Sequence, residues 1–241
     1  MKLLFVASDG REFAGLLTHV AQVRPAGLAV DWSRAGRLGG NDVLLVANGV
    51  GWKRAAAAVD AAAGGFRPDA VVSMGFCGAL DDRLEIADVV VATSIVAQAF
   101  LPVSPTYTGK NACATATGKN ACAIVGPICS IDHVAATAAE KRALRDSGAI
   151  AVEMEAAGVA QRAEALQLPF YCVKAVTDLA GESMANDFNS ALRSDGHFDT
   201  ISVFKGTLRH PTIRIPELIR LRKRCARAAR ELGEFLADCR F

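Results

Sequence analysis

Residues 151–181, "AVEMEAAGVAQRAEALQLPFYCVKAVTDLAG", contain the pattern that decides the fold. Two carboxylates, Glu153 and Glu155, flank Met154 at the start of a stretch with helical composition. The apolar run "LPFYCVKAVTD" (168–178) follows and ends on an aspartate. A continuous apolar run of this length is typical of a strand that is buried on both faces, so we expect a sheet that is covered by helices.

Outward from this stretch, apolar runs and helical stretches alternate along the whole chain. This order is typical of an α/β protein. No linker interrupts it, so we expect one domain over residues 1–241. The strands are expected within 2–7, 41–51, 69–80, 87–96, 121–131 and 168–178, and the helices within 52–65, 136–148, 154–166 and from about 216.

The composition bounds the class of protein. Hydrophobic residues make up 51% of the 241 positions, which favours a packed globular chain, and a net charge of +2 predicts no nucleic-acid surface. Seven cysteines without a CxxC motif predict reduced, buried thiols, with no metal site. No signal-peptide core or transmembrane run occurs, so a soluble cytoplasmic protein is expected. No motif indicates a cofactor.

The heptad TGKNACA occurs twice, at 108–114 and at 117–123. Its Gly-Lys pair could suggest a phosphate-binding loop, but the upstream glycine is missing and Asn follows Lys in place of Ser or Thr. A hairpin of two short strands, or a local duplication, is the favoured interpretation.

Four stretches carry residues that could do chemistry, and each also has a plain structural explanation. Glu12 follows the first expected strand, where an acid often only stabilises a helix start. Gly75 could let backbone approach a ligand or could serve packing. Glu153 and Glu155 could bind a vicinal diol or cap a helix. Asp178 could be a general acid or an N-cap.

Together these stretches resemble the nucleoside phosphorylase/nucleosidase superfamily, and methylthioadenosine/S-adenosylhomocysteine nucleosidases in particular. The resemblance is carried by "MKLLFVASDGREF", "NGVGWKRAAAA", "VVSMGFCGALDDRLEIADVVVA" and the Met-Glu and Thr-Asp pairs of the first stretch. It implies a three-layer α/β/α fold with a central mixed twisted sheet, and a homodimer. It also implies cleavage of the N-glycosidic bond of a purine nucleoside, with adenine as the expected base.

The resemblance also assigns catalytic roles. Glu155 would hold the ribose hydroxyls, and Met154 would pack against the sugar. Asp178 would protonate N7 of the purine, and Thr177 would orient this acid. Glu12 would activate the attacking water. An oxocarbenium-like transition state needs this set of groups: a carboxylate near the sugar, an acid at the leaving base and a base at the water.

Further residues are expected around the substrate. Phe188 matches a family aromatic residue near the 5′ side of the sugar, which often comes from the partner subunit. His133 and Val134 are candidates for stacking on the base, and Gly75 for approaching the ligand. Glu153 keeps a supporting or capping role.

The stretch "SMGFCG" departs from the phosphorylase pattern. Ser73 and Phe76 stand where the phosphorylases have an Arg and a Ser that bind phosphate. An anion site without its Arg favours water as the nucleophile. Phe76 also replaces a small polar residue of the nucleosidases, so phosphorolysis stays an alternative, as does a binding protein without catalysis.

Two features are similar to the hopanoid-associated branch, whose members remove adenine from adenosylhopane. The segment before "PICSID" is short, which would suit a bulky 5′ group, and the tail from 209 is rich in arginine. Apolar residues recur there at helical spacing. Such a basic amphipathic helix can rest weakly on an anionic membrane or can dock on the domain, and docking is the commoner case.

Overall fold

The computed structural model describes residues 1–97 and 123–241. Apart from its last residue, Ala123, the TGKNACA repeat lies outside the described residues, so the hairpin expected there stays a prediction.

A mixed sheet of nine strands runs through the described part of the chain. Its order is β2-β3-β4-β1-β5-β8-β7-β6-β9, and β9 pairs again with β5, so the last five strands close into a ring. Strand β1 is parallel to β4 and β5, and β5 is parallel to β9. The strands are β1 Lys2–Ala7, β2 Ala21–Pro25, β3 Trp32–Leu38, β4 Asn41–Ala47, β5 Ala70–Ala79, β6 Val89–Ala97, β7 Ile124–Ser130, β8 Ala151–Glu153 and β9 Phe170–Asp178.

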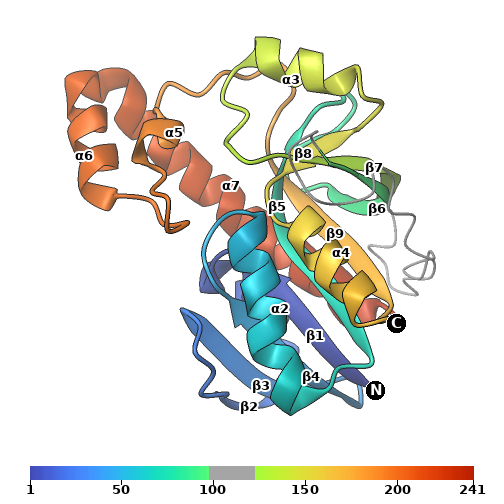
Figure 1. The fold of residues 1–241 in the computed structure, drawn as a ribbon. Coiled ribbons are helices and arrows are strands. Elements are labelled where there is room, and N and C mark those ends of the chain that lie inside the picture. Colours follow the sequence, from blue (N-terminus) through green and yellow to red (C-terminus); the bar gives the residue numbers. More distant parts are fainter. Residues whose placement is uncertain (98–122) are drawn as a thin grey trace.

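Helices cover both faces of this sheet, as expected for a three-layer fold (Figure 1). Side chains of β1 alternate between the faces, so Leu4 packs on the side of α2 and α4 while Phe5 packs on the side of α1 and α7. The helices are α1 Ala14–Leu17, α2 Trp52–Phe66, α3 Ala138–Arg145, α4 Ala156–Ala165, α5 Phe188–Ala191, α6 Thr200–Arg209 and α7 Pro211–Asp238, with a 3₁₀ turn at Gly10–Phe13.

The differences from the expected elements have local causes. Strand β2 lies at the sheet edge with every residue exposed, so its sequence carries no apolar run. Helix α7 begins at Pro211, ahead of the expected 216, because proline is favoured in the first turn of a helix. The apolar stripe in its second half is buried against the sheet, so docking, the commoner case, holds there.

The cysteines correct one expectation. Cys77, Cys129 and Cys172 are buried free thiols, and Cys225 is free and half-buried. Cys239 is disulfide-bonded, so the prediction of reduced thiols throughout is wrong at that position. Among the described residues, no cluster of His, Cys, Asp and Glu could hold a metal ion. None of the helices in the described ranges combines the length and the apolar character of a transmembrane span.

Candidate active site

A cavity of about 250 Å³ opens at the carboxyl ends of β1, β5 and β9. Parallel strands bring their carboxyl ends to the same edge of a sheet, where α/β proteins bind ligands. Ten of the eleven residues expected at a site line this cavity, and Gly75 does not. The ten are Glu12, Phe76, His133, Val134, Glu153, Met154, Glu155, Thr177, Asp178 and Phe188.

Glu12 lies in the 3₁₀ turn after β1 and is only 5% exposed. Its carboxylate accepts hydrogen bonds from the hydroxyl and from the backbone N–H of Ser8. Burial, and then the nearby charge of Glu155, raise the pKa of Glu12 to about 8, although Lys174 and Ser8 oppose the shift. An acid with this pKa can serve as a general base near neutral pH.

Two glycines of β5 make room for the carboxylates of the cavity. Gly75 has a φ of +131°, and a Cβ there would come within 2.1 Å of Glu12 Oε2. A Cβ at Gly78 would lie 2.7 Å from Asp178 Oδ2. The structure therefore places Gly75 against a side chain of the site, whereas the sequence interpretation placed it at the ligand.

Glu155 is buried at the start of α4. Its Oε1 accepts a hydrogen bond of 3.1 Å from the backbone N–H of Gly51, and its Oε2 lies 3.5 Å from Lys174 Nζ. Burial raises the pKa of Glu155, while Lys174 acts in the opposite direction. The carboxylate lines the cavity, where it can accept hydrogen bonds from a ligand's hydroxyl groups.

Glu153 makes different contacts from those of Glu155. Its Oε2 accepts the backbone N–H groups of Glu155 at 2.9 Å and of Ala156 at 2.8 Å. The same oxygen pairs with Lys174 Nζ at 2.9 Å. Glu153 therefore caps the start of α4, which is the supporting role expected from the sequence.

Lys174 was missed by the sequence interpretation. It lies in β9 with 1% of its surface exposed, between the carboxylates of Glu153 and Glu155, and it donates to the carbonyl of Met74. Burial lowers the pKa of Lys174, but the two carboxylates outweigh burial and raise it. The available signal was a lone cation inside "FYCVKAV", because a buried charge needs a buried counter-charge.

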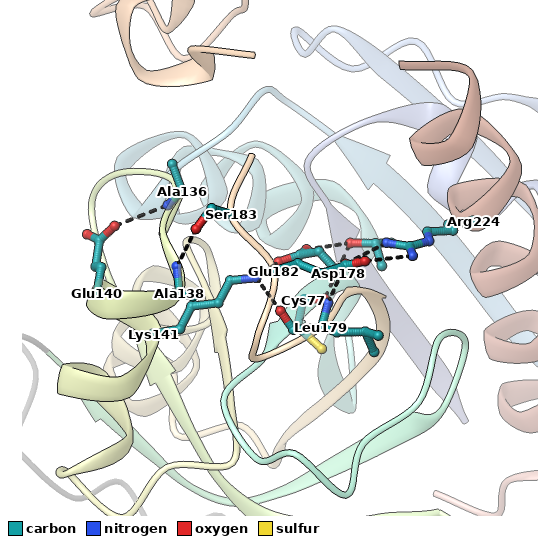
Figure 2. Close-up of polar contacts among 11 residues, drawn as sticks. Cys77, Ala136, Ala138, Glu140, Lys141, Asp178, Leu179, Glu182, Ser183 and Arg224 are labelled. Carbon is teal, nitrogen blue, oxygen red and sulfur yellow. Dashed lines mark hydrogen bonds and ion pairs between the residues drawn. The ribbon is translucent and has the colours of Figure 1, made fainter. Parts of the chain in front are cut away.

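Asp178 ends β9 and receives two side-chain contacts. Thr177 Oγ1 donates to Asp178 Oδ1 at 3.1 Å. Lys141 of α3 pairs with Asp178 Oδ2 and also donates to the carbonyl of Leu179 at 2.8 Å (Figure 2). Lys141 is 1% exposed, so this contact is shielded from water. The sequence interpretation missed Lys141, because α3 and β9 are brought together only by the fold.

The segment after Asp178 is held from two sides. Glu182 accepts the backbone N–H of Leu179 at 3.0 Å and pairs with Arg224 of α7 at 2.6 and 2.9 Å. The hydrogen bond from Arg224 is the main reason that the pKa of Glu182 falls to about 2. On the other side, Ser183 accepts the backbone N–H of Ala138 in α3 at 3.0 Å. Figure 2 shows this strap between α3 and α7.

His133 and Val134 lie on a loop before α3. The two ring nitrogens of His133 contact Asp132 at 2.8 Å and Glu140. Burial lowers the pKa of His133, but these two carboxylates outweigh it and raise the pKa. Both nitrogens are thus occupied, so His133 offers a ligand only the apolar parts of its ring. Val134 is tied to Asn189 by hydrogen bonds of 2.8 and 2.9 Å.

Comparisons with known proteins describe a consistent set of relatives. The family model described as "Phosphorylase superfamily" matches residues 2–197. The 5′-methylthioadenosine/S-adenosylhomocysteine nucleosidase of Shewanella sediminis is 26% identical over 84% of this chain and 97% of its own length. The nucleosidase of the same name from Glaesserella parasuis is 28% identical over 80% of this chain and 92% of its own length.

Solved structures share the fold. The Neisseria meningitidis 5′-methylthioadenosine/S-adenosylhomocysteine nucleosidase, in complex with methylthio-immucillin-A, superposes with a TM-score of 0.77 at 21% identity over 98% of this chain and 97% of that one. The futalosine hydrolase of Helicobacter pylori superposes with a TM-score of 0.73 at 17% identity over 99% and 96%.

Proposed function

The chain belongs to the phosphorylase superfamily, and from this premise we propose that it is an enzyme that cleaves the N-glycosidic bond of a purine nucleoside. We propose adenine as the base of the substrate, because the relatives are named for methylthioadenosine and S-adenosylhomocysteine. One observation carries the proposal: Glu12, Glu155 and Asp178, which lie far apart in the sequence, line one cavity.

Each of the three carboxylates receives a role. Asp178, positioned by Thr177 and Lys141, donates the proton of its carboxylic acid form to N7 of the departing base, and Lys141 stabilises the carboxylate that results. Glu155 accepts hydrogen bonds from the ribose hydroxyls and stabilises the positive charge that develops on the sugar. Glu12 removes a proton from the attacking water.

Water is favoured over phosphate as the nucleophile. Among the described residues that line the cavity there is no Arg or Lys, whereas four carboxyl groups line it: Glu12, Glu153, Glu155 and Asp178. Phosphate recognition in proteins relies on such cations, so the described lining offers a phosphate ion no cationic partner. Phosphorolysis is the second candidate and stands on the family name alone.

The decisive assay measures adenine release from methylthioadenosine and from S-adenosylhomocysteine, each with and without inorganic phosphate. We expect release at the same rate in both conditions, with free ribosyl product. A rate that depends on phosphate would replace hydrolysis by phosphorolysis. Tight nucleoside binding without any release of adenine would make the chain a binding protein. If the nucleoside were neither bound nor cleaved, the proposal would be wrong.

The pH dependence of the reaction should report Glu12. A general base must be ionised, and the pKa of Glu12 is raised to about 8. We therefore expect kcat/KM to fall as pH decreases below about 8. The variant Glu12→Gln should be much slower, and its kcat/KM should not show this fall at low pH. A series of kcat/KM measurements from pH 5.5 to 9.5 on both proteins would test this.

A stability measurement tests the same buried acid independently of catalysis. The folded pKa of Glu12 lies above its ordinary value of 4.5, so the folded state binds the proton more tightly than the unfolded state does. Wild-type stability is then lost as pH rises from 4.5 to about 8, at about 1.4 kcal/mol per pKa unit. The gain in Tm of Glu12→Gln over wild type should increase from pH 5 to pH 9. An equal Tm difference at both pH values would contradict the shift.

Lys141 should act on the reaction through Asp178. Lys141→Met removes a charge-assisted contact, so we expect kcat to fall about 10- to 100-fold. In an Asp178→Asn background the same change should have little further effect, because the two residues share one function. Arg142→Met, an exposed neighbour, is the matched control. Equal losses in both backgrounds would mean that Lys141 only supports the fold.

The cavity lining also bears on the 5′ group of the substrate. The apolar residues Val50, Phe188 and Phe198 line the cavity and support an apolar 5′ group, for which adenosylhopane is the bulky candidate. Phe188 reaches the cavity from the same chain. A homodimer is proposed on the resemblance. A cytoplasmic location stays a prediction from the sequence, as does weak contact between the basic C-terminal helix and a membrane surface.

A further inference from the structure

The hairpin of α6 and the first half of α7 presents large apolar side chains to solvent. On α6, the exposed fractions are 65% for Ile201, 62% for Phe204 and 52% for Leu208. On α7 they are 62% for Ile213 and 52% for Ile219. Together with Ile215 on α7, these side chains are six of the eleven exposed large hydrophobic residues in the described chain, and we refer to this set as the outer face. Figure 1 shows the hairpin projecting from the body of the sheet.

The two helices contact each other and the chain behind them through polar groups. Arg214 of α7 donates to the carbonyl of Gly206 in α6. Thr207 donates to Asn186 Oδ1 at 2.9 Å, and Asn186 donates to the buried Glu217 at 2.6 Å. The polar groups thus lie inside and the apolar groups outside, which is the reverse of a helix hairpin that stands in water. An apolar face of this kind indicates a binding surface.

The same hairpin is strongly basic. From Thr200 to Lys223 the sole acidic residue is Glu217, which is buried. Five basic side chains of this segment are exposed, and in the described chain none of them lies within 4.0 Å of a carboxylate. They are Lys205, Arg209, Arg220, Arg222 and Lys223.

We infer that this outer face binds the surface of a lipid bilayer that contains anionic lipids. The bilayer interface offers an apolar layer for the isoleucines, Phe204 and Leu208, and negative headgroups for the flanking cations. A second copy of the chain fits less well, because a two-fold contact would place this basic face against itself. The surface differs from the one expected from sequence, since the stripe in the second half of α7 is buried and α6 supplies much of the new face.

The position of the hairpin connects this surface to the cavity. Phe198, just before α6, and Leu221, just after Ile219, both line the cavity. The cavity therefore opens beside the proposed membrane face. The bilayer contact does not require that the cavity cleaves a nucleoside, and its test needs no substrate.

The test is co-flotation of the full chain with large unilamellar vesicles. One set contains phosphatidylcholine alone, and the other contains phosphatidylcholine and phosphatidylglycerol at about 7:3, because anionic lipid should attract the basic residues. We expect binding to the anionic vesicles that weakens as salt increases. Phe204→Ser/Ile213→Ser should reduce the bound fraction at least about tenfold, and Lys205→Glu/Arg222→Glu should reduce binding to the anionic vesicles alone.

The matched control is Val23→Ser/Arg24→Glu on the exposed edge strand β2, which should bind as wild type does. Circular dichroism and thermal unfolding check that every variant is folded. No binding of the wild type to anionic vesicles, or equal binding by Phe204→Ser/Ile213→Ser, would overturn the inference. A wild-type dimer that this variant converts to a monomer in sedimentation would assign the face to a second copy instead.

Discussion

Replacing Asp178 by Asn is expected to lower kcat for adenine release about 10²- to 10⁴-fold, which is the usual contribution of a general acid. The amide keeps the shape of the side chain and can still accept a hydrogen bond from Thr177 or Lys141, but it cannot donate a carboxylic proton to the departing base. Nucleoside binding should persist, because uncharged N7 can still accept a hydrogen bond from the amide. Single-turnover rates and equilibrium dialysis of the same nucleoside would separate the two effects.

Asp187→Asn is the matched control for this variant. Asp187 caps α5 through the backbone N–H of Ser190 and does not line the cavity, and Asn caps a helix about as well as Asp. Its rate should equal that of the wild type. If Asp178→Asn retained nearly full kcat, the proton would have to come from another group, and the role of Asp178 would be wrong.

Replacing Lys174 by Met is expected to cost about 3–5 kcal/mol of unfolding free energy, because it leaves buried carboxylates without their cation. Lys174 is 1% exposed, and both Glu153 and Glu155 are also buried. Urea denaturation at pH 7 would measure the loss, and nucleoside affinity should fall with it, since Glu155 loses a contact that holds it in place.

A second substitution keeps this prediction testable even if Lys174→Met does not fold. Adding Glu153→Gln removes one of the unpaired charges, so the double variant should recover part of the lost stability. Arg142→Met, which removes an exposed cation from α3, should change stability by less than about 0.5 kcal/mol. A loss of the same small size for Lys174→Met would contradict the buried charge cluster.

Sequence patterns were sufficient for most of the architecture. Continuous apolar runs predicted β1, β4, β5, β6, β7 and β9, and the structure and the matching fold confirm a mixed sheet between helices. Strand β2 was not predicted because it lies at the sheet edge with every residue exposed, so no hydrophobic pattern is required there. Strand β3, between β2 and β4, is only partly buried and carries two arginines, and β8 has only three residues, so neither forms an apolar run. The single domain over residues 1–241 stays a prediction.

For the candidate site too, the sequence predicted some residues and missed others. Glu12, Glu155 and Asp178 could be proposed from sequence through the family resemblance, since each alone also had a structural explanation. Glu12 and Asp178 then lie at one edge because β1 and β9 are both parallel to β5. Most of the residues that contact these carboxylates could not be predicted from the sequence. Lys141, which contacts Asp178, lies in a helix 37 positions earlier in the sequence. Gly75 has no side chain, which leaves the room that the carboxylate of Glu12 occupies. Such contacts depend on how helices pack on the sheet, which no local pattern encodes.

The sequence by itself determined the fold class, because hydrophobic burial acts on residue type and spacing alone. It indicated the carboxylates at the strand ends through the family resemblance. Tertiary structure decided the difference between Glu153 and Glu155. Both are acids in the same short stretch, yet Glu153 turns to Lys174 and the N–H groups of α4, while Glu155 accepts Gly51 and lines the cavity. Electrostatic environment depends on distance in space, so the role of each charge was fixed only when the chain folded around it.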